Sequence, residues 1–416
     1  MIKLNYVKAI KCRECGKELP PVIAYTCDEC FGPLDVLYDY DSIELRRNSF
    51  KRRPRTVWRY SELLPVSDVS KAIDIGAGYT ALRKCVRLGE CLGLKNLYVK
   101  DDTVNPTGSF KDRPAAVAVS TALQFGMKAV GCASTGNLAA SVAAHAAIAS
   151  LKCYVFVPTG IEMNKIVQAT TYGATIISVK GTYDDANRLA AQAGDAYGLA
   201  LANINIRPYY VEGSKTLAFE TCEQLGWKTP DLAVIPVGSG ALLCAIQKGF
   251  EELNKLGLIN SSGPRLVGVQ PEGCSPVVNA FRTGAEDVHP VEEPRTVAKS
   301  LAIGDPGDGV YALKLIRKTG GVAESVTDEE ILQGIRLLAK TEGVFSEPAG
   351  GVSIAVLRKL LEYGKISRDE VIVCYVTGNG LKAGDALLNG AQKPIEVEPT
   401  LSSLAKVLHL RRYNEC

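Results

Sequence analysis

Lys111 is the residue whose surroundings most directly suggest chemistry. It lies in the run from Asn105 to Arg113 (NPTGSFKDR), which follows a short apolar segment, Leu97 to Val99, typical of a strand. A lysine amine attacks a carbonyl only when it is unprotonated, so Schiff-base lysines are held where burial or a nearby positive charge lowers their pKa. Arg113 and the Ser109 hydroxyl lie within two residues. Taken alone, the run also fits an exposed loop lysine at the start of a helix.

A second run, STGN, follows the apolar segment Ala129 to Ala133 and contains Ser134, Thr135 and Asn137. It opens an alanine-rich stretch with the composition of a helix. The first N–H groups of a helix have no partner within it, and the helix dipole favours negative charge there. This junction is therefore a candidate site for a carboxylate.

Two further junctions have the same form. A glycine-rich run follows Leu232 to Val237 and opens another predicted helix, which is the outline of a phosphate cradle. Its candidate phosphate-binding residues are Gly238, Ser239, Gly240, Ala241 and Leu242. Thr377 begins the run TGNG after Val371 to Val376, at the carboxyl end of a strand, where open α/β sheets bind ligands. The four junctions together fit a phosphorylated aromatic aldehyde, so the carbonyl chemistry of Lys111 is the preferred interpretation.

These runs stand in the order found in fold-type II pyridoxal-phosphate enzymes, and within that group the chain resembles the threonine synthases. The likeness extends to Trp58–Val66 (WRYSELLPV) and Pro394–Leu401 (PIEVEPTL). The resemblance implies that Lys111 holds pyridoxal 5'-phosphate as a Schiff base and, once freed, takes the α-proton of the substrate. It also implies cofactor contacts from Asn137 and from Thr377, whose hydroxyl meets the pyridine nitrogen. The implied reaction converts O-phosphohomoserine and water to threonine and phosphate.

The resemblance further implies a set of substrate-binding residues. Ser134 and Thr135 belong to the substrate side of the STGN run. Lys165 stands where the family places a lysine for the substrate phosphate, although a helix-surface lysine is the alternative at this position. The family commonly has asparagine-proline followed two residues later by arginine, and Arg207-Pro208 and Tyr210 take those places here. The positive charge is retained at a displaced position, so Arg207 is the second candidate for the substrate phosphate.

A metal site is predicted near the start of the chain. Two Cys-x-x-Cys pairs separated by eleven residues supply four thiols, those of Cys12, Cys15, Cys27 and Cys30. Such spacing is typical of a four-thiolate zinc ribbon, and a redox or decayed pair is the alternative. A ribbon this small cannot bury a core of its own, so zinc would contribute to its folding. We expect a structural zinc ion, remote from the chemistry.

The segment from Arg46 to Arg59 is rich in arginine. Beside a zinc ribbon it suggests a nucleic-acid patch, but no interleaved aromatic residues or basic fold follow it. We therefore interpret it as a solvated linker.

The predicted fold class is α/β, with two doubly wound domains of fold-type II and a zinc-ribbon-like segment before them. Short apolar segments alternate with helical ones between about 127 and 202, which predicts a small parallel sheet. We expect the ribbon in residues 1–45 and the large cofactor-binding domain in residues 46–125 and 205–416. A small mobile domain is expected in residues 126–204, with the cofactor between the two.

The 416 residues exceed the usual size of one hydrophobic core, and 46% hydrophobic and 22% charged residues are ordinary for a folded chain. With 48 basic and 45 acidic residues, the net charge of +3 favours a small-molecule substrate over nucleic acid. No apolar run of membrane-spanning length and no signal peptide are evident. We expect a cytoplasmic homo-oligomer without nucleic-acid or membrane partners. The cysteines outside the ribbon mostly lie singly in apolar segments, so buried free thiols are expected.

Only three histidines occur, His145, His289 and His409, and none has a triad-like or metal-ligand context. Lys111 is therefore the preferred base. Three alternatives remain open. Threonine dehydratase and a β-replacing synthase acting on phosphoserine would share the cofactor contacts. A zinc-ribbon binding protein that has lost activity is the non-enzyme alternative, which intact Lys111, Asn137 and Thr377 disfavour.

Overall fold

The computed structural model describes residues 4–388 and 394–408, so His409 lies outside the described part. The chain divides into two compact units, Met1–Ala383 and Gly384–Cys416. The second unit contains two described helices, α13 (Asp385–Leu388) and α14 (Leu401–Leu408). The three sheets described below all belong to the first unit.

A six-stranded sheet is the largest element of this unit, with the order β12-β11-β10-β13-β5-β4. Its strands are β4 (Leu82–Lys84), β5 (Asn96–Asp101), β10 (Leu232–Pro236), β11 (Arg265–Pro271), β12 (Val322–Val326) and β13 (Val371–Val376). Five strands run parallel, and only the edge strand β4 is antiparallel to its neighbour. The central strands are continuous apolar runs such as LAVIP in β10, because parallel strands are covered on both faces.

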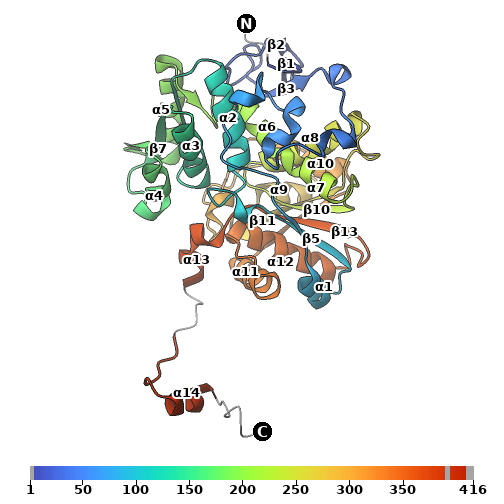
Figure 1. Cartoon of the computed structure of the whole chain (residues 1–416), viewed down its shortest axis with the longest axis vertical. Coiled ribbons are helices and arrows are strands. Elements are labelled where there is room, and N and C mark those ends of the chain that lie inside the picture. Colours follow the sequence, from blue (N-terminus) through green and yellow to red (C-terminus); the bar gives the residue numbers. More distant parts are fainter. Residues whose placement is uncertain (1–3, 389–393, 409–416) are drawn as a thin grey trace. The chain divides into compact units, whose positions relative to one another are not determined.

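Helices cover both faces of this sheet. Figure 1 shows α1, α11 and α12 below the strands and α7, α8 and α10 above them. Their bounds are α1 (Val86–Leu92), α2 (Asp112–Gln124), α6 (Arg207–Ser214), α7 (Thr216–Gln224), α8 (Ala241–Lys255), α9 (Pro276–Thr283), α10 (Gly309–Lys318), α11 (Asp328–Glu342) and α12 (Pro348–Glu362). Thr327 and Glu330 form a capping box that fixes the start of α11. Two helical layers on a parallel sheet confirm the predicted doubly wound α/β class.

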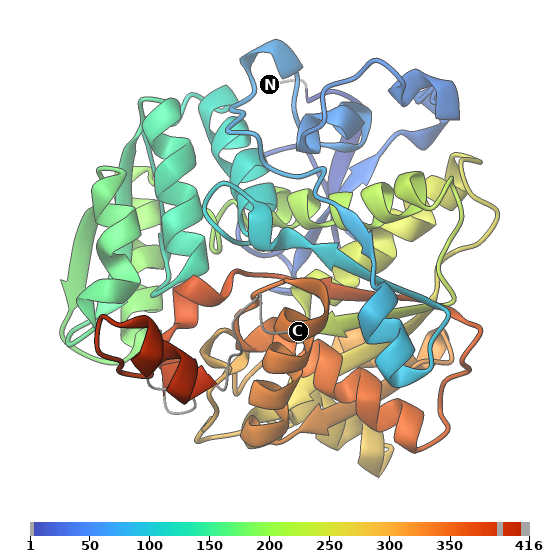
Figure 2. The same ribbon diagram turned by 60° about the horizontal axis from the view of Figure 1, so that its bottom comes forward.

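A second, four-stranded parallel sheet has the order β8-β7-β6-β9. Its elements are β6 (Ala129–Ala133), α3 (Asn137–Ile148), β7 (Lys152–Pro158), α4 (Met163–Thr171), β8 (Thr175–Val179), α5 (Tyr183–Tyr197) and β9 (Ala200–Leu201). They group to one side of the large sheet in both Figure 1 and Figure 2. The small parallel sheet predicted between 127 and 202 is thereby confirmed, whereas the exact domain boundaries stay a prediction.

A three-stranded antiparallel sheet precedes both, with β1 (Val7–Cys12) between β2 (Glu18–Leu19) and β3 (Leu34–Tyr38). It packs on α6 and α8 through buried polar contacts. Lys248 of α8 donates to Asp35 over 3.3 Å and to Glu212 of α6 over 2.6 Å. The Tyr38 hydroxyl donates to the other Glu212 oxygen over 2.7 Å. The cysteine-bearing segment is therefore docked on the two helices that carry much of the candidate site.

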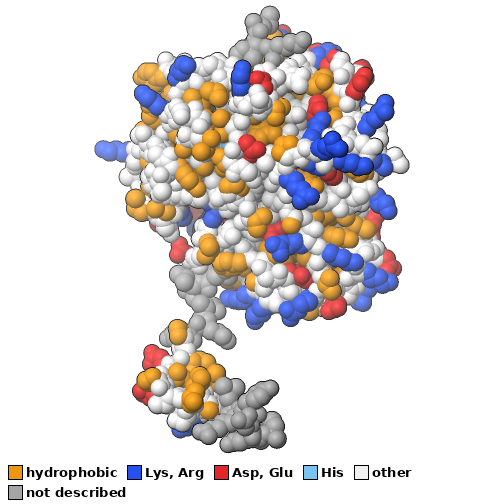
Figure 3. Space-filling view, viewed as in Figure 1, with side chains coloured by type: hydrophobic (Ala, Val, Ile, Leu, Met, Phe, Trp, Pro, Cys, Tyr) orange, Lys and Arg blue, Asp and Glu red, His pale blue; other side chains and the backbone are white. Residues whose placement is uncertain are grey.

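The arginine-rich segment is only partly a solvated linker. Arg46 and Arg55 are exposed, but Arg59 is buried and paired with Glu223 at 2.6 Å. The face in Figure 3 carries Lys and Arg side chains interspersed with acidic and hydrophobic ones. Within the described part of the chain, no helix has the length and apolar character needed to cross a membrane.

Candidate functional site

The loop that carries Lys111 is held by a set of short polar contacts. Asp112 accepts hydrogen bonds from the Thr107 N–H and hydroxyl, both over 2.7 Å. Gly108 has a φ of +79°, which lets the chain turn between them at no steric cost. The Phe110 N–H donates to the carbonyl of Thr377 over 2.8 Å, so the loop is tied to the end of β13. Lys111, the N-cap residue of α2, therefore lies between two anchored residues, Phe110 and Asp112.

The Lys111 amine is half-buried and faces α6. It donates a hydrogen bond to the Tyr210 hydroxyl over 2.9 Å and lies 4.6 Å from the centre of the Phe110 ring. In the sequence Tyr210 appears only as a replacement for an arginine of the family pattern. Tyr210 lies in α6, and nothing in the sequence near this residue indicates that its hydroxyl reaches Lys111.

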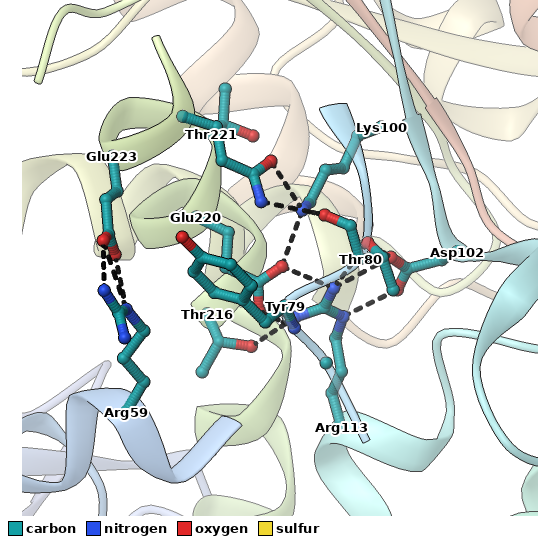
Figure 4. A network of polar contacts seen from close by, with 12 residues as sticks. Arg59, Tyr79, Thr80, Lys100, Asp102, Arg113, Thr216, Glu220, Thr221 and Glu223 are labelled. Atoms are coloured by element: carbon teal, nitrogen blue, oxygen red, sulfur yellow. Dashed lines mark hydrogen bonds and ion pairs between the residues drawn. The ribbon is translucent and has the colours of Figure 1, made fainter. Parts of the chain in front are cut away.

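Arg113 does not act on Lys111 as its neighbouring position in the sequence suggests. Figure 4 shows its guanidinium in a buried cluster, where it pairs with Asp102 at 2.6 Å and with Glu220. Lys100 pairs with Glu220 at 2.6 Å from the other side. Burial alone would raise the pKa of Glu220, but Arg113 and Lys100 outweigh it and lower the pKa to about 2. The guanidinium of Arg113 thus holds α2 to α7 and to the turn that follows β5.

Asn137 contacts the buried carboxyl group of Glu347, the residue before α12. The Asn137 side-chain amide donates to Glu347 over 2.9 Å. Burial raises the pKa of Glu347, while Asn137, Lys382 and Lys111 oppose the rise. Gly378 leaves room for this carboxyl group, since a Cβ there would lie 2.5 Å from Glu347 Cδ. The pair joins the start of α3 to the start of α12.

Two buried hydroxyls beside Thr377 test whether the site fits a polar ligand. Ser109 and Ser346 are fully buried, and their oxygens have no hydrogen-bond partner among the described residues. Their backbones pair with Gly378 and Asn379 respectively. Thr377 itself is 3% exposed at the carboxyl end of β13. Unsatisfied buried hydroxyls are costly, so their placement fits a bound group that supplies partners.

The glycine loop follows β10 and enters α8 as predicted. Gly240 has a φ of +92° at the N-cap of the helix, which only glycine adopts readily. The N–H groups from Gly238 to Leu242 therefore lie at a helix N-terminus, with the geometry of an anion site. The Asp308 N–H donates to the Ser239 carbonyl over 2.8 Å and anchors the loop.

The predicted substrate residues fall into two groups. Ser134 and Thr135 are half-buried at the N-terminus of α3, directly before Asn137. Lys165 is on α4, where it pairs with Glu162 at 3.1 Å, and Arg207 pairs with Asp308 at the first turn of α6. Each of these two cations thus has an acidic partner in the structure. Their role toward a substrate phosphate stays a prediction.

Lys382 is a further cation at the site that the sequence did not suggest. Its amine donates to the carbonyl of Thr107 over 2.9 Å and to the Gln168 side chain over 2.6 Å. Burial lowers its pKa, and Glu347 opposes that effect. Since Gln168 belongs to α4, Lys382 bridges the Lys111 loop and the small sheet.

The four cysteines of the predicted ribbon come together. Their sulfur atoms all lie within 4.8 Å of one another, with Cys12 and Cys30 3.4 Å apart and Cys15 and Cys27 3.7 Å apart. Zinc bonds of about 2.3 Å in a tetrahedron place sulfur atoms roughly 3.8 Å from each other. The four thiols therefore fit a single zinc ion. Elsewhere the predicted buried thiols Cys132, Cys153, Cys244 and Cys374 are indeed free and buried.

Two of the three histidines lie in the described part of the chain. His145 is fully buried in α3, bonded to the Ser141 carbonyl at 2.8 Å, and burial lowers its pKa. His289 is exposed. Neither contacts Lys111.

Comparison with known proteins gives consistent results. A family model described as pyridoxal-phosphate dependent enzyme matches residues 73–378. The threonine synthase of Methanocaldococcus jannaschii is 46% identical over 402 residues, covering 96% of this chain and 98% of that protein. The threonine synthase of Methanosarcina acetivorans is 43% identical over 401 residues, with the same coverage of each chain.

Solved structures with the same fold include two other enzymes. Threonine deaminase isoform 2 from Solanum lycopersicum has a TM-score of 0.62 and 23% identity, covering 79% of this chain and 87% of that one. Diaminopropionate ammonia lyase from Escherichia coli has a TM-score of 0.63 and 19% identity, covering 82% and 95%. At these identities the likeness concerns the fold alone.

Proposed function

Because the chain belongs to the threonine synthase family of pyridoxal-phosphate-dependent enzymes, we propose that it converts O-phosphohomoserine and water to threonine and phosphate. The observation that supports this proposal is a chain of contacts between the segments that carry Lys111, Thr377 and Asn137. The Phe110 N–H donates to the Thr377 carbonyl, the Glu347 N–H donates to the Gly378 carbonyl, and the Asn137 amide donates to the Glu347 side chain.

Pyridoxal 5'-phosphate is the proposed cofactor, and it supplies a carbonyl for a covalent link to an amine and a ring that withdraws electrons from the substrate. Lys111 Nζ would form the link, and the N–H groups of Gly238, Ser239, Gly240, Ala241 and Leu242 would bind the phosphate. The Thr377 hydroxyl would meet the ring nitrogen, and Asn137 would contact the ring substituents. A neutral hydroxyl, unlike a carboxylate, does not enforce protonation of the ring nitrogen.

Proton movement would depend on Lys111 and its neighbours. The Lys111 amine, once free, is the proposed base for the substrate α-proton. The Tyr210 hydroxyl, 2.9 Å from Nζ, orients that amine and can exchange a proton with it. Glu347 retains its proton to a higher pH than an ordinary glutamate, since burial raises its pKa. Its hydrogen bond from Asn137 fixes this carboxyl group at the start of α12.

We assign different residues to the two charged groups of the substrate, its carboxylate and its phosphate. The N-terminus of α3, with Ser134 and Thr135, would bind the substrate carboxylate. Lys165 and Arg207 are proposed to bind the substrate phosphate, exchanging their present acidic partners for it. Such an exchange keeps each cation paired before and after binding.

Zinc is proposed for Cys12, Cys15, Cys27 and Cys30, as one structural ion per chain. Metal analysis of protein prepared without chelators should find about one zinc per chain, and its absence would reject the site. The homo-oligomeric state and the cytoplasmic location expected from the sequence also stay predictions.

The function is tested by incubating the protein separately with O-phosphohomoserine, O-phosphoserine and threonine. Threonine and phosphate released in equal amounts from O-phosphohomoserine are the expected result. Formation of 2-oxobutyrate from threonine as the main reaction would favour a dehydratase instead. Turnover of O-phosphoserine alone would favour a β-replacing synthase, and no turnover of any of the three would favour the binding protein.

A further inference from the structure

Arg13 lies inside the first cysteine pair and points out of the ribbon into the body of the protein. Its guanidinium pairs with Asp308 at 2.7 Å and stacks 3.9 Å from the centre of the Tyr311 ring. Glu14, the next residue, accepts a hydrogen bond from the Tyr311 hydroxyl. Both residues between Cys12 and Cys15 therefore contact the N-terminal end of α10, at Asp308 and Tyr311.

Asp308 in turn packs directly against the glycine loop. Its side chain is 2% exposed, and its N–H donates to the Ser239 carbonyl over 2.8 Å. A Cβ added to Gly240 would lie 2.6 Å from the Asp308 carbonyl oxygen, so the two backbones are in direct contact. A shift of Asp308 would therefore displace the loop that is proposed to bind the cofactor phosphate.

Arg13 also reaches the helix that this loop opens. Cys244 stands in the first turn of α8, and its N–H donates to the Gly240 carbonyl over 3.1 Å. Burial raises the pKa of the Cys244 thiol to about 12, and the adjacent Arg13 opposes that rise. The guanidinium is thus close to α8 as well as to Asp308.

The Asp308 carboxylate depends on two cations from distant segments. One oxygen pairs with Arg13 and the other with Arg207 at the start of α6. A buried carboxylate needs such partners to remain charged and fixed. Removing Arg13 would leave Arg207 as the single cation on Asp308 and free the carboxylate to turn toward it.

We propose that Arg13 is a positioning residue for the phosphate-binding loop, so that metal loading of the cysteine cluster sets the affinity for the cofactor phosphate. The metal fixes the Cys12–Cys15 turn, the turn holds Arg13 on Asp308, and Asp308 holds Ser239 and Gly240. This inference rests on the proposed function, because it takes the glycine loop as the phosphate site.

The test compares binding of pyridoxal 5'-phosphate and of pyridoxal, which lacks the phosphate, to cofactor-free protein. In wild type the phosphate should tighten binding strongly. Arg13→Ala should weaken pyridoxal 5'-phosphate binding about tenfold and leave pyridoxal binding unchanged. Lys17→Ala is the matched control, since Lys17 is a ribbon cation whose partners Asp28 and Glu29 lie within the ribbon. Its affinities should equal those of wild type.

Two further samples complete the experiment, the Arg13→Lys variant and wild-type protein stripped of metal. Arg13→Lys retains the charge without the planar stack on Tyr311, so its loss of phosphate-specific affinity should be smaller; it also serves if Arg13→Ala does not fold. Wild type stripped of metal, as verified by metal analysis, should show the same phosphate-specific loss as Arg13→Ala. Wild-type affinities in both Arg13 variants would overturn the positioning role, and full affinity in stripped protein would overturn control by the metal. If phosphate gives wild type no advantage, the failure lies in the proposed function.

Discussion

The Asn137 amide and the Glu347 carboxyl group, 2.9 Å apart, connect the first helix of the small sheet to helix α12 of the large one. The pKa of a buried glutamate is raised when its hydrogen-bond partner is neutral, and it is lowered when the glutamate lies between two cations. Glu347 and Glu220 represent the two cases in this protein.

Glu347→Gln should stabilise the cofactor-free protein at high pH. The pKa of Glu347 is raised in the folded state, so the stability that its protonated form contributes is present below the ordinary glutamate pKa and is lost as pH rises through the folded-state value. Glutamine removes that loss. The variant should therefore have a higher Tm than wild type at pH 8, and the difference should shrink toward pH 4. A difference that grows toward acid pH would contradict the raised pKa.

Glu220→Gln should have the opposite effect. The pKa of Glu220 falls from 4.5 to about 2, so its contribution is present above pH 4.5 and is lost as pH falls toward 2. Breaking such a buried pair costs about 3–5 kcal/mol. Chemical unfolding at pH 7 should show a loss of this size, which diminishes in acid. A loss that is constant from pH 7 to pH 3 would mean that Glu220 does not titrate as inferred.

Lys111→Ala should give a colourless protein. Wild type with pyridoxal 5'-phosphate should absorb in the visible range, and borohydride should bleach that band and fix the cofactor on Lys111. Lys128→Ala is a suitable control, because Lys128 is an exposed lysine just beyond α2. Peptide mapping of the reduced protein identifies the modified lysine. Equal colour in the Lys111 variant would contradict the assignment of the covalent link.

The strands that lead into the candidate site could be predicted from the sequence, including the residues at which they end. Ala129–Ala133 and Val371–Val376 are continuous apolar runs because both faces of a parallel sheet are buried, and the structure has them as β6 and β13 with the same bounds. The loops after them carry candidate site residues, since parallel strands bring their carboxyl ends to one edge. Local sequence was therefore enough to propose Lys111, Asn137 and Thr377.

Partners across the site were not predictable in this way. Tyr210, Glu347 and Lys382 reach it from segments far apart in the chain, and each side chain's direction depends on how helices from different layers pack. The same reason explains Arg113, which is two residues from Lys111 but points to Asp102 and Glu220. It also explains Arg13, whose place in a cysteine pair suggested only a metal knuckle.

Tyr210→Phe should slow the reaction and leave the colour intact. Phenylalanine keeps the ring and removes the hydroxyl that accepts from Lys111 Nζ over 2.9 Å. A hydrogen bond between neutral groups is worth about 0.5–1.5 kcal/mol, so kcat/KM should fall roughly two- to tenfold. Steady-state kinetics on O-phosphohomoserine together with the visible spectrum measure both effects. An unchanged kcat/KM would show that the hydroxyl neither orients the amine nor exchanges its proton.

Lys165→Ala and Arg207→Ala test the proposed phosphate contacts. If each cation leaves its acidic partner for the γ-phosphate of the substrate, each variant loses a charge-assisted contact worth about 1.5–3 kcal/mol. The kcat/KM for O-phosphohomoserine, measured with each variant saturated with cofactor, should then fall by about one to two orders of magnitude. Arg188→Ala is the matched control, because Arg188 pairs with Asp185 three residues earlier just as Lys165 pairs with Glu162. If both variants keep the kcat/KM of the control, these cations do not bind the substrate phosphate, and a dehydratase acting on an unphosphorylated amino acid becomes the better interpretation.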